Sequence, residues 1–490
     1  MTPWLAGALV FYTSGAVLVV EILAGRLLAP YVGVSLETYT GVIGTVLAGI
    51  AAGTWAGGTL ADRLSPRRSL GPLLVAGGGL CLASVPLVRL MGPSSVGGGS
   101  VDVVWLSAVA FFGPAAVLSA VTPTVVKLQL HDLNVTGRVV GRLSALATAG
   151  AIVGTFLAGF VLVEAVPTTT AVLVIGVSVM VVGVGLWLWL AKATRSVVTS
   201  VGMVALLGTG LVAAAGDPCD VETVYHCALV VRDEGRPAGR LLILDDLQHS
   251  YVDLADPTHL EFRYAKVFAD VIEASAPSGP LNALHVGGGG FTMPRYLRSV
   301  RPGSTSVVLE IDPGVVEVAR ERLGLRTAPD LRVEVGDARL LLGDAPGGHD
   351  VALGDAFGGR AVPWHLTTVE FVRALHQKLR PGGLYVLNVI DHPPFRFARA
   401  EVATLARTFG HVAVIVPQAL ADGVEGGNVV IAASDQPIDH AAVRARVAAR
   451  AGVEVVVAGT QFAGDAPVLR DDHAPVDQWL AQDRRSAARR

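Results

Sequence analysis

The sequence predicts a multi-span α-helical membrane region followed by a doubly wound α/β (Rossmann-like) domain, with a small β-hairpin subdomain between them. Mean hydropathy is +0.55, which is too high for an ordinary soluble protein of 490 residues. Charged residues are sparse up to about Gly216 and recur every few positions from Asp217 onward. Beyond Asp217, short apolar runs alternate with segments of helical periodicity. These three observations predict a membrane domain over residues 1–216 and a soluble remainder.

The first 216 residues contain seven apolar runs of the length that a membrane helix needs. About 20 consecutive apolar residues are required, because every backbone amide must be hydrogen-bonded within the segment. The first run lacks a basic start and is followed by further spans, so we expect a membrane helix there rather than a cleaved signal peptide. The predicted spans are 4–24, 41–61, 70–91, 103–126, 143–164, 170–191 and 198–215.

Lys and Arg gather in alternate short loops, and this asymmetry predicts the orientation. The loops after the second, fourth and sixth spans are the basic ones, which places them in the cytoplasm. The amino terminus is then inside and, after a seventh span, the soluble half is outside the cell membrane. A cofactor made in the cytoplasm fits the opposite placement, which would hold if the 198–215 stretch were re-entrant or another span miscounted. The basic loop residues are Arg63, Arg67, Arg68, Lys127, Arg138, Arg142, Lys192 and Arg195.

Two features of the membrane half bear on function. The stretch GGTLADRLSPRR at 57–68 resembles the short turn between spans two and three of major-facilitator transporters, although a tight basic loop explains it as well and seven spans are too few for such a transporter. Glu21 and Glu164 are carboxylates within or beside spans, and such residues are functional candidates. For Glu21, an ion pair with Arg26 is the alternative.

The soluble half divides into three predicted parts. Residues 217–265 form a small antiparallel β subdomain, whose DEGRPAG stretch is a hairpin turn. Residues 266–435 form the α/β domain, and 436–490 form a C-terminal helical extension. Cys219 and Cys227 lie eight positions apart at the start of this half, a spacing that suits a disulfide in an oxidising compartment. The α/β strands are expected in NALHVGGGG, TSVVLEID, LRVEVGDA, HDVALGDA and GGLYVLNVI.

Glycine or acidic residues follow four successive predicted strands. Ligands of doubly wound sheets bind at the carboxyl ends of the strands, near the point where strand order reverses. The first strand is followed by Gly287, Gly288, Gly289 and Gly290, where backbone can approach a ligand at a helix N-terminus. A carboxylate after the second strand commonly accepts hydrogen bonds from ribose hydroxyls. A nucleoside-containing ligand is therefore predicted, and the later strand-end residues are Glu310, Asp312, Asp337, Ala338 and Asp355.

Residues 220–420 resemble the spermidine synthases, which are polyamine aminopropyltransferases, and in particular the branch with a multi-span amino-terminal region. The EIDPGVV stretch and the glycine run are shared with methyltransferases that use S-adenosylmethionine (AdoMet), whereas HDVALGDAF and the upstream hairpin are more selective. The full set of matching stretches is GGGG, VVLEIDPGVVEVAR, VGDAR, HDVALGDAF, TTVEFVRALHQKLRPGGLYVLNV, LDDLQHSYVDL and DPTHLEF.

The resemblance implies transfer of an aminopropyl group from decarboxylated AdoMet to an amine such as putrescine, with no metal and no tightly bound cofactor. Glu310 would hold the ribose, Asp337 and Ala338 the adenine, and Asp355 would be the general base that takes a proton from the attacking amine. Packing is the alternative role for the two tyrosines among the implied amine-binding residues. Those residues are His226, Gln248, Tyr251, Tyr264 and Asp355.

Three positions depart from the family pattern. Gly290 stands where an Asp usually binds the aminopropyl ammonium, and Gly358 stands where a second Asp usually grips the polyamine. His226 replaces a frequent glutamine. Because an unpaired buried charge costs several kcal/mol, these changes put a polyamine substrate in doubt and leave the nucleoside pocket unaffected.

Two other functions stay open from the sequence. One is an AdoMet-dependent methyltransferase acting on a membrane-associated substrate, and the other is a nucleoside- or polyamine-sensing domain that regulates a transporter-like membrane half. The net charge of −3 and the lack of a basic run with aromatics argue against nucleic acid. The expected partners are the lipid bilayer, the small-molecule substrates and, as an option, a second copy of the chain as a homodimer.

Overall fold

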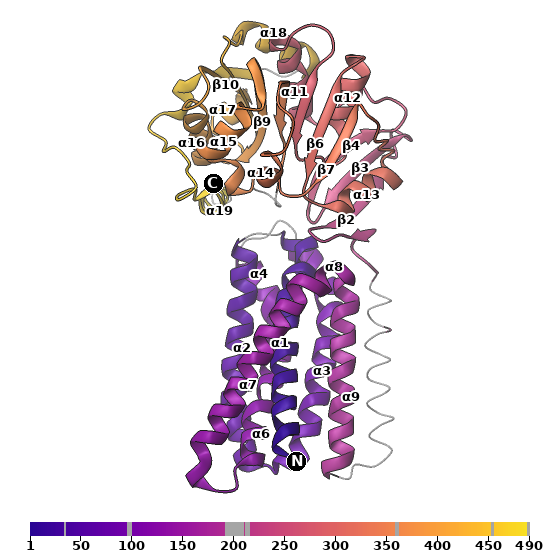
Figure 1. Ribbon diagram of the computed structural model, residues 1–490, viewed down its shortest axis with the longest axis vertical. Coiled ribbons are helices and arrows are strands. Elements are labelled where there is room, and N and C mark those ends of the chain that lie inside the picture. The colour runs from indigo at the N-terminus through magenta and orange to yellow at the C-terminus, as the bar shows by residue number, and fades with distance from the viewer. Residues whose placement is uncertain are drawn as a thin grey trace. The chain divides into compact units, whose positions relative to one another are not determined.

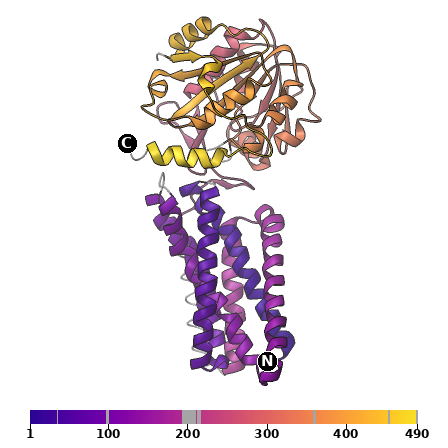
Figure 2. The same ribbon diagram turned by 90° about the vertical axis from the view of Figure 1, so that its left-hand side faces the viewer.

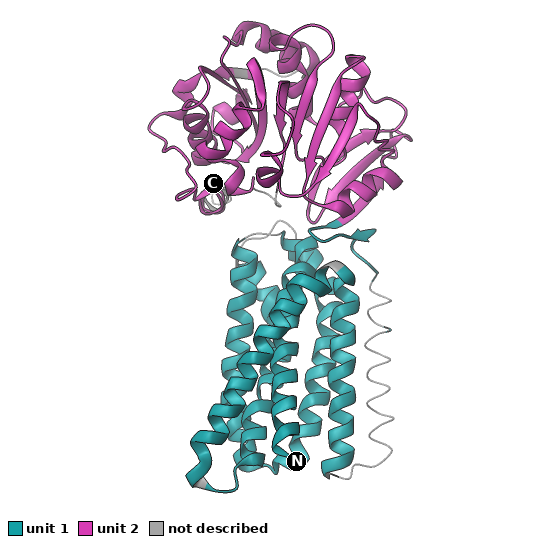
Figure 3. Cartoon of the chain, viewed as in Figure 1, with its two compact units in different colours: residues 1–227 teal, residues 228–490 magenta. Residues whose placement is uncertain are grey.

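The computed structural model describes residues 1–33, 36–95, 100–191, 210, 216–357, 362–451 and 455–487. The chain forms two compact units, Met1–Cys227 and Ala228–Arg490 (Figure 3). The division lies beyond the boundary predicted near residue 217. One reason is that Arg26 of the first helix hydrogen-bonds the backbone carbonyls of Thr223 and Val224, which ties the following segment to the helical unit.

The first unit is a bundle of long helices that lie side by side (Figures 1 and 2). π-helical turns at Ala108–Phe112 and Ala158–Leu162 join neighbouring helices, so each joined set continues in one direction. A two-residue strand, β1 (Val221–Glu222), follows the bundle. The helices are α1 (Pro3–Val32), α2 (Leu36–Arg63), α3 (Pro66–Met91), α4 (Ser100–Ser107), α5 (Gly113–Ser119), α6 (Val121–Gln129), α7 (Thr136–Leu157), α8 (Val163–Ala165) and α9 (Thr168–Ala191).

Six helical segments of this unit are long and apolar enough to cross a membrane. Each overlaps one of the first six spans predicted from the sequence, and several extend beyond the predicted ends. The seventh predicted span, 198–215, lies outside the described residues except for Gly210. The six segments are Pro3–Val32, Leu36–Arg63, Pro66–Ser95, Val101–Gln129, Thr136–Leu162 and Thr168–Leu190.

The sequence left open an ion pair between Arg26 and Glu21, and the structure does not contain this pair. The Arg26 guanidinium lies 3.5 Å from the carboxylate of Glu222 and donates to Thr168 Oγ1 at 3.2 Å. Glu21 is buried, and among the described residues its Oε2 atom has no hydrogen-bond partner. On either side of Glu222 in the sequence, Cys219 and Cys227 form a disulfide with their Cα atoms 5.4 Å apart.

The second unit begins with a small antiparallel sheet, as predicted for the β subdomain with its hairpin turn. Strand β2 (Cys227–Arg232) pairs with β3 (Gly239–Leu244), which pairs with β4 (Leu247–Asp253). Asp233 shapes the first turn, because its Oδ1 accepts from the Gly235 N–H at 2.9 Å. The small sheet thereby brings residues 248–250 of β4 toward the larger sheet, which is described next.

The larger sheet has eight strands in the order β12-β10-β11-β9-β8-β5-β6-β7. Strands β5 to β9 run parallel and β10 to β12 join antiparallel beyond β9. This order confirms the doubly wound α/β prediction. The strands are β5 (Asn282–Val286), β6 (Thr305–Glu310), β7 (Leu331–Val335), β8 (His349–Gly354), β9 (Leu379–Asp391), β10 (His411–Pro417), β11 (Gly427–Ser434) and β12 (Val455–Ala458).

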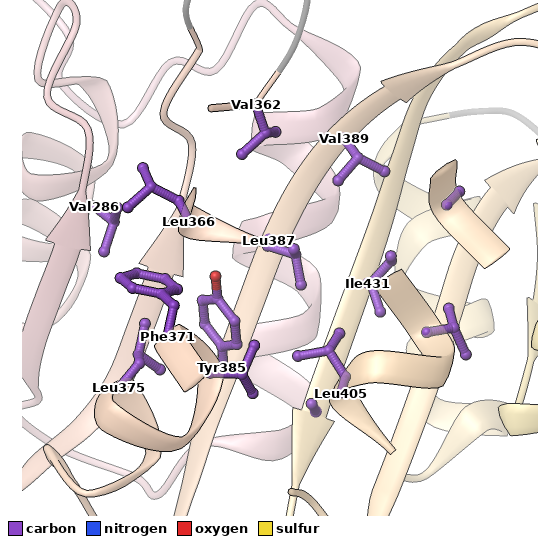
Figure 4. Close-up of a cluster of buried hydrophobic side chains, with 14 of the residues drawn as sticks. Val286, Val362, Leu366, Phe371, Leu375, Tyr385, Leu387, Val389, Leu405 and Ile431 are labelled. Carbon is purple, nitrogen blue, oxygen red and sulfur yellow. The ribbon is translucent and has the colours of Figure 1, made fainter. Parts of the chain in front are cut away.

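Helices cover both faces of this sheet, and two apolar clusters fill the space between. Along β9, Tyr385 and Leu387 point to one cluster and Leu384 and Val386 to the other, as strand alternation requires. Figure 4 shows the first cluster, where Phe371 packs beside Tyr385. The helices are α11 (Arg263–Ser275), α12 (Thr292–Val300), α13 (Pro313–Arg322), α14 (Ala338–Leu341), α15 (Val369–His376), α16 (Arg396–Leu405), α17 (Gln418–Ala421), α18 (His440–Ala451) and α19 (Val476–Ala487).

The predicted C-terminal helical extension, 436–490, needs a correction. It contains α18 and α19, but β12 between them pairs with β10, so the segment completes the sheet. Strand β10 was also missing from the prediction.

The topological switch, where the strand order reverses, lies between β5 and β8. These two strands are adjacent in the sheet although β6 and β7 separate them in the sequence. A ligand site is expected at the carboxyl ends of these two strands.

Candidate active site

A cavity of about 290 Å³ lies at the switch point. Its walls come from β4, the start of α11, the loop after β5, the end of β8, and β9 and β11. A smaller cavity of about 30 Å³ adjoins it and shares several lining residues. The residues common to both are Ser250, Phe262, Tyr264, Gly288 and Asp355.

Asp355 is held where β8 ends, beside the glycine loop. Its backbone N–H donates to the Val286 carbonyl at 2.9 Å. A Cβ at Gly287, whose φ is +96°, would come too close to the Asp355 carbonyl, so a glycine there permits this approach. The Asp355 side chain reaches both cavities, and Asn388 Nδ2 donates to its Oδ1 at 3.1 Å.

The surroundings of Asp355 favour its protonated form more than water does. Burial raises the pKa of Asp355 to about 6, while hydrogen bonds from Asn388 and Tyr264 act in the lowering direction. Burial also raises the pKa of Tyr264 well above its usual value, so its hydroxyl stays a donor. A carboxyl group with a pKa near 6 is suited to accept a proton near neutral pH.

Glu310 binds the glycine loop directly. Its Oε2 accepts from the N–H groups of Gly288 at 2.8 Å and Gly289 at 3.2 Å, and its Oε1 accepts from the Asp312 N–H at 3.0 Å. The Glu310 carboxylate is buried at the end of β6. It therefore fixes the loop after β5 relative to β6, at the edge of the sheet where a ribose is predicted to bind.

The other predicted nucleoside-binding residues occupy helix starts. Asp312 is buried and caps α13 by accepting from the Gly314 N–H at 2.8 Å. Asp337 caps α14 through the Arg339 N–H at 2.8 Å and also accepts from His365 Nε2 at 3.0 Å. Ala338 packs in the core. None of Glu310, Asp312, Asp337 and Ala338 lines either described cavity, so their contact with adenosine remains a prediction.

Gly290 does not line the described cavities. Its N–H donates to Ser250 Oγ at 2.9 Å, and a Cβ added to Gly290 would lie 2.7 Å from Ser250 Cβ. Gly287 lines the smaller cavity, Gly288 both and Gly289 the larger one. Gly358, the other departure from the family pattern, lies outside the described residues.

The predicted amine-binding residues are only partly brought together. Gln248 lines the larger cavity and Tyr264 lines both. Tyr251 lines the smaller one, but its hydroxyl donates to Asp233 Oδ2 at 2.7 Å, which fits the packing alternative. His226 belongs to the other compact unit, where its backbone N–H donates to Thr223 Oγ1 at 2.8 Å.

The sequence did not predict several residues of the larger cavity, and three of them bear on its charge and hydrogen bonding. Asn388 and Asn428 come from β9 and β11, and Asn428 Nδ2 donates to Asn388 Oδ1 at 3.0 Å. Arg263 is the first residue of α11. A polar residue inside the apolar LYVLNVI strand was the available signal for Asn388. Within the described part of the chain, no group of three or more His, Cys, Asp or Glu side chains is placed to hold a metal ion.

No protein-family model matches the chain. A polyamine aminopropyltransferase of Vibrio vulnificus is 33% identical over 156 residues, which are 31% of this chain and 50% of that protein. The α/β unit is spermidine synthase-like. A second polyamine aminopropyltransferase, from Chromobacterium violaceum, is 28% identical over 159 residues, which are 32% of this chain and 60% of that protein. The matches thus span about half the length of these relatives, which are transferases.

Solved structures also match this chain. One of them is a probable spermidine synthase from Corynebacterium glutamicum, with 31% sequence identity and a TM-score of 0.49. The match covers 51% of this chain and 95% of that chain.

Proposed function

We propose that this chain is a membrane-anchored aminopropyltransferase that moves the aminopropyl group of decarboxylated AdoMet to an amine, with Asp355 as the general base. The observation that carries the proposal is the position of Asp355. It lies at the switch point, beside the glycine loop, in a cavity large enough for a small amine. The relatives among polyamine aminopropyltransferases support the same reaction class.

In the proposed reaction, the lone pair of the acceptor nitrogen attacks the aminopropyl carbon bonded to sulfur. A C–N bond forms, the C–S bond breaks with its electron pair going to sulfur, and methylthioadenosine leaves as a neutral thioether. The acceptor amine must first lose a proton, because it is an ammonium ion at neutral pH. The Asp355 carboxylate takes that proton, while the Asn388 amide holds the carboxylate in place.

Three groups at the strand ends would hold the nucleoside in this proposal. The Glu310 carboxylate is expected to accept from the ribose hydroxyls, and Asp337 with Ala338 is expected to contact the adenine. The hydrogen bonds of Glu310 to the loop of Gly288 and Gly289 support this, because they set that loop against the end of β6. The donor is a substrate, so the proposal needs no resident cofactor.

The membrane part of the proposal rests on the six long apolar helices. We infer that they cross the lipid bilayer as a multi-pass anchor. If the 198–215 stretch also crosses, the α/β unit is outside, and the Cys219–Cys227 disulfide supports that side because disulfides persist in oxidising compartments. Labelling of introduced surface cysteines in intact cells with an impermeant maleimide tests this. Labelling at Arg232→Cys supports the outside placement, and protection until lysis places the unit inside.

The function is tested with the full chain in detergent. Purified protein is incubated with decarboxylated AdoMet and a panel of amines, and methylthioadenosine release is measured. Parallel titration calorimetry compares decarboxylated with intact AdoMet. Release that depends on an amine supports the proposal. Strong preference for intact AdoMet with methyl transfer would replace it by the methyltransferase alternative, and nucleoside binding without turnover would favour the sensor.

A further inference from the structure

The charges around the larger cavity are unusual for a site that takes a diamine. Among the described residues that line it, Asp355 is the sole acid, and Arg263 is the sole Lys or Arg. Three more wall positions carry neutral amides, Gln248, Asn388 and Asn428. A diamine with both nitrogens protonated needs a carboxylate at each end to replace the water that it loses. This wall offers one.

A second carboxylate cannot be restored at the glycine loop. A Cβ at Gly290 would lie 2.7 Å from Ser250 Cβ and 3.1 Å from Val252 Cγ2, so the fold fills the space into which an acidic side chain would extend. The Ser250 hydroxyl uses the remaining room to accept from the Gly290 N–H. Glu261 is a nearby acid, but it lines the smaller cavity and pairs with His259 at 3.0 Å.

Arg263 lies on the acceptor side of the cavity. The predicted nucleoside positions follow β5, β6 and β7, whereas α11, which begins at Arg263, packs against β9 and β11 on the other side of β8. Arg263 is exposed, and within the described residues it has no ion-pair or hydrogen-bond partner. Its guanidinium presents donors that suit a carboxylate.

From this arrangement we propose that the acceptor is an amino acid-like monoamine, whose amine faces Asp355 and whose carboxylate pairs with Arg263. The inference rests on the proposed function and names the substrate class of the same site. Arg263 attracts the anionic end of such an acceptor and repels the second ammonium of a diamine. The amides of Asn388 and Asn428, which form a hydrogen-bonded pair, line the wall without adding charge. Arg263 is thus the residue that sets acceptor specificity.

The test compares acceptors that differ in the charge of one end. Full-length protein in detergent is given decarboxylated AdoMet with 4-aminobutyrate, putrescine or butylamine, and kcat/KM for methylthioadenosine release is measured. We expect 4-aminobutyrate to exceed putrescine by about tenfold or more in the parent chain. Arg263→Glu reverses that order, Arg263→Gln removes the preference, and Arg263→Lys keeps most of it. Arg232→Glu, at an exposed β2 position away from the cavity, is the matched control.

Two results would overturn the inference while leaving the proposed function intact. They are a parent preference for putrescine and equal effects of Arg263→Glu and Arg232→Glu. A preference for intact AdoMet that Arg263→Gln abolishes would put the anion on the donor and would contradict the proposed function as well. Failure of the proposed function has a different signature. If no amine releases methylthioadenosine, calorimetry on the methylthioadenosine-loaded chain still tests the acceptor site. Binding of 4-aminobutyrate that Arg263→Glu removes supports the site. Absent binding, or equal binding in the parent and the Arg263→Glu variant, rejects it.

Discussion

Glycine serves different purposes in the two compact units. In the helical unit, glycines sit where helices touch: a Cβ at Gly150 of α7 would overlap the Phe11 carbonyl of α1, and one at Gly49 of α2 would lie 2.9 Å from the Ala115 Cβ. Such small residues let apolar helices pack closely, which matters where lipid removes the hydrophobic drive for association. In the α/β unit, Gly287 instead makes room for Asp355.

This contrast separates stability from chemistry along the chain. The bundle interior is apolar, and its stability depends on how closely the helices fit. Substitutions there should be most damaging at positions where a larger side chain has no room. The α/β site depends on a few polar groups at strand ends, so its sensitive positions are those that hold or exchange a proton. Substitutions in one unit should therefore change quantities that substitutions in the other leave alone.

The largest effect is expected from Asp355→Asn, which changes chemistry and leaves the fold intact. Losing the general base should lower kcat by about 10²- to 10⁴-fold while methylthioadenosine affinity stays nearly unchanged. In the parent, the rate should rise with pH through about 6, since the carboxyl group must lose its proton to act. Asp344→Asn, at an exposed site, is the control. Equal turnover in the Asp355→Asn variant and the parent would defeat the assignment.

Gly150→Val should lower the stability of the helical bundle and leave the chemistry of the α/β site unchanged. A larger side chain between α1 and α7 forces the helices apart, and overpacking of this kind typically costs about 1–3 kcal/mol. Thermal unfolding of the full chain in detergent should show the loss as a lower first transition. The control is Gly141→Val on the same helix, where an added Cβ meets nothing within 4 Å. Similar shifts for both variants would show that helix contact at Gly150 is not what matters.

Glu310→Gln tests the polar side of the comparison at the nucleoside end. The amide nitrogen would face N–H donors that Glu310 now satisfies with two carboxylate oxygens. We expect decarboxylated AdoMet and methylthioadenosine to bind about 1–3 kcal/mol more weakly, measured by calorimetry. Glu317→Gln, exposed on α13, should leave affinity unchanged. An unaltered affinity at Glu310→Gln would remove this residue from the nucleoside site.

Much of the architecture could be predicted because both units carry long, simple patterns. The apolar runs of β5, β6 and β8 are buried because parallel strands inside such a sheet are covered on both faces, whereas the edge strand β7 alternates polar and apolar residues. Strand β12 was missed because it has four residues, follows an Ala/Arg-rich helix and pairs with a non-adjacent strand. The position of Asp355 followed from its place after a strand. The roles considered for Arg263 and Asn388 depend on which elements the fold brings beside β8, and one sequence does not contain that information.

The smallest effect is expected at Asn388, which acts on the reaction through Asp355. Its hydrogen bond at 3.1 Å lowers the pKa of Asp355 against the raising effect of burial. In Asn388→Leu that pKa should rise above about 6, so the rate–pH curve should move toward higher pH and the rate near pH 7 should fall several-fold. Asn428→Leu, which removes only the support of Asn388, should move the curve less. A purely structural role predicts a lower rate at every pH with no movement of the curve, and that result would exclude Asn388 as a positioning residue.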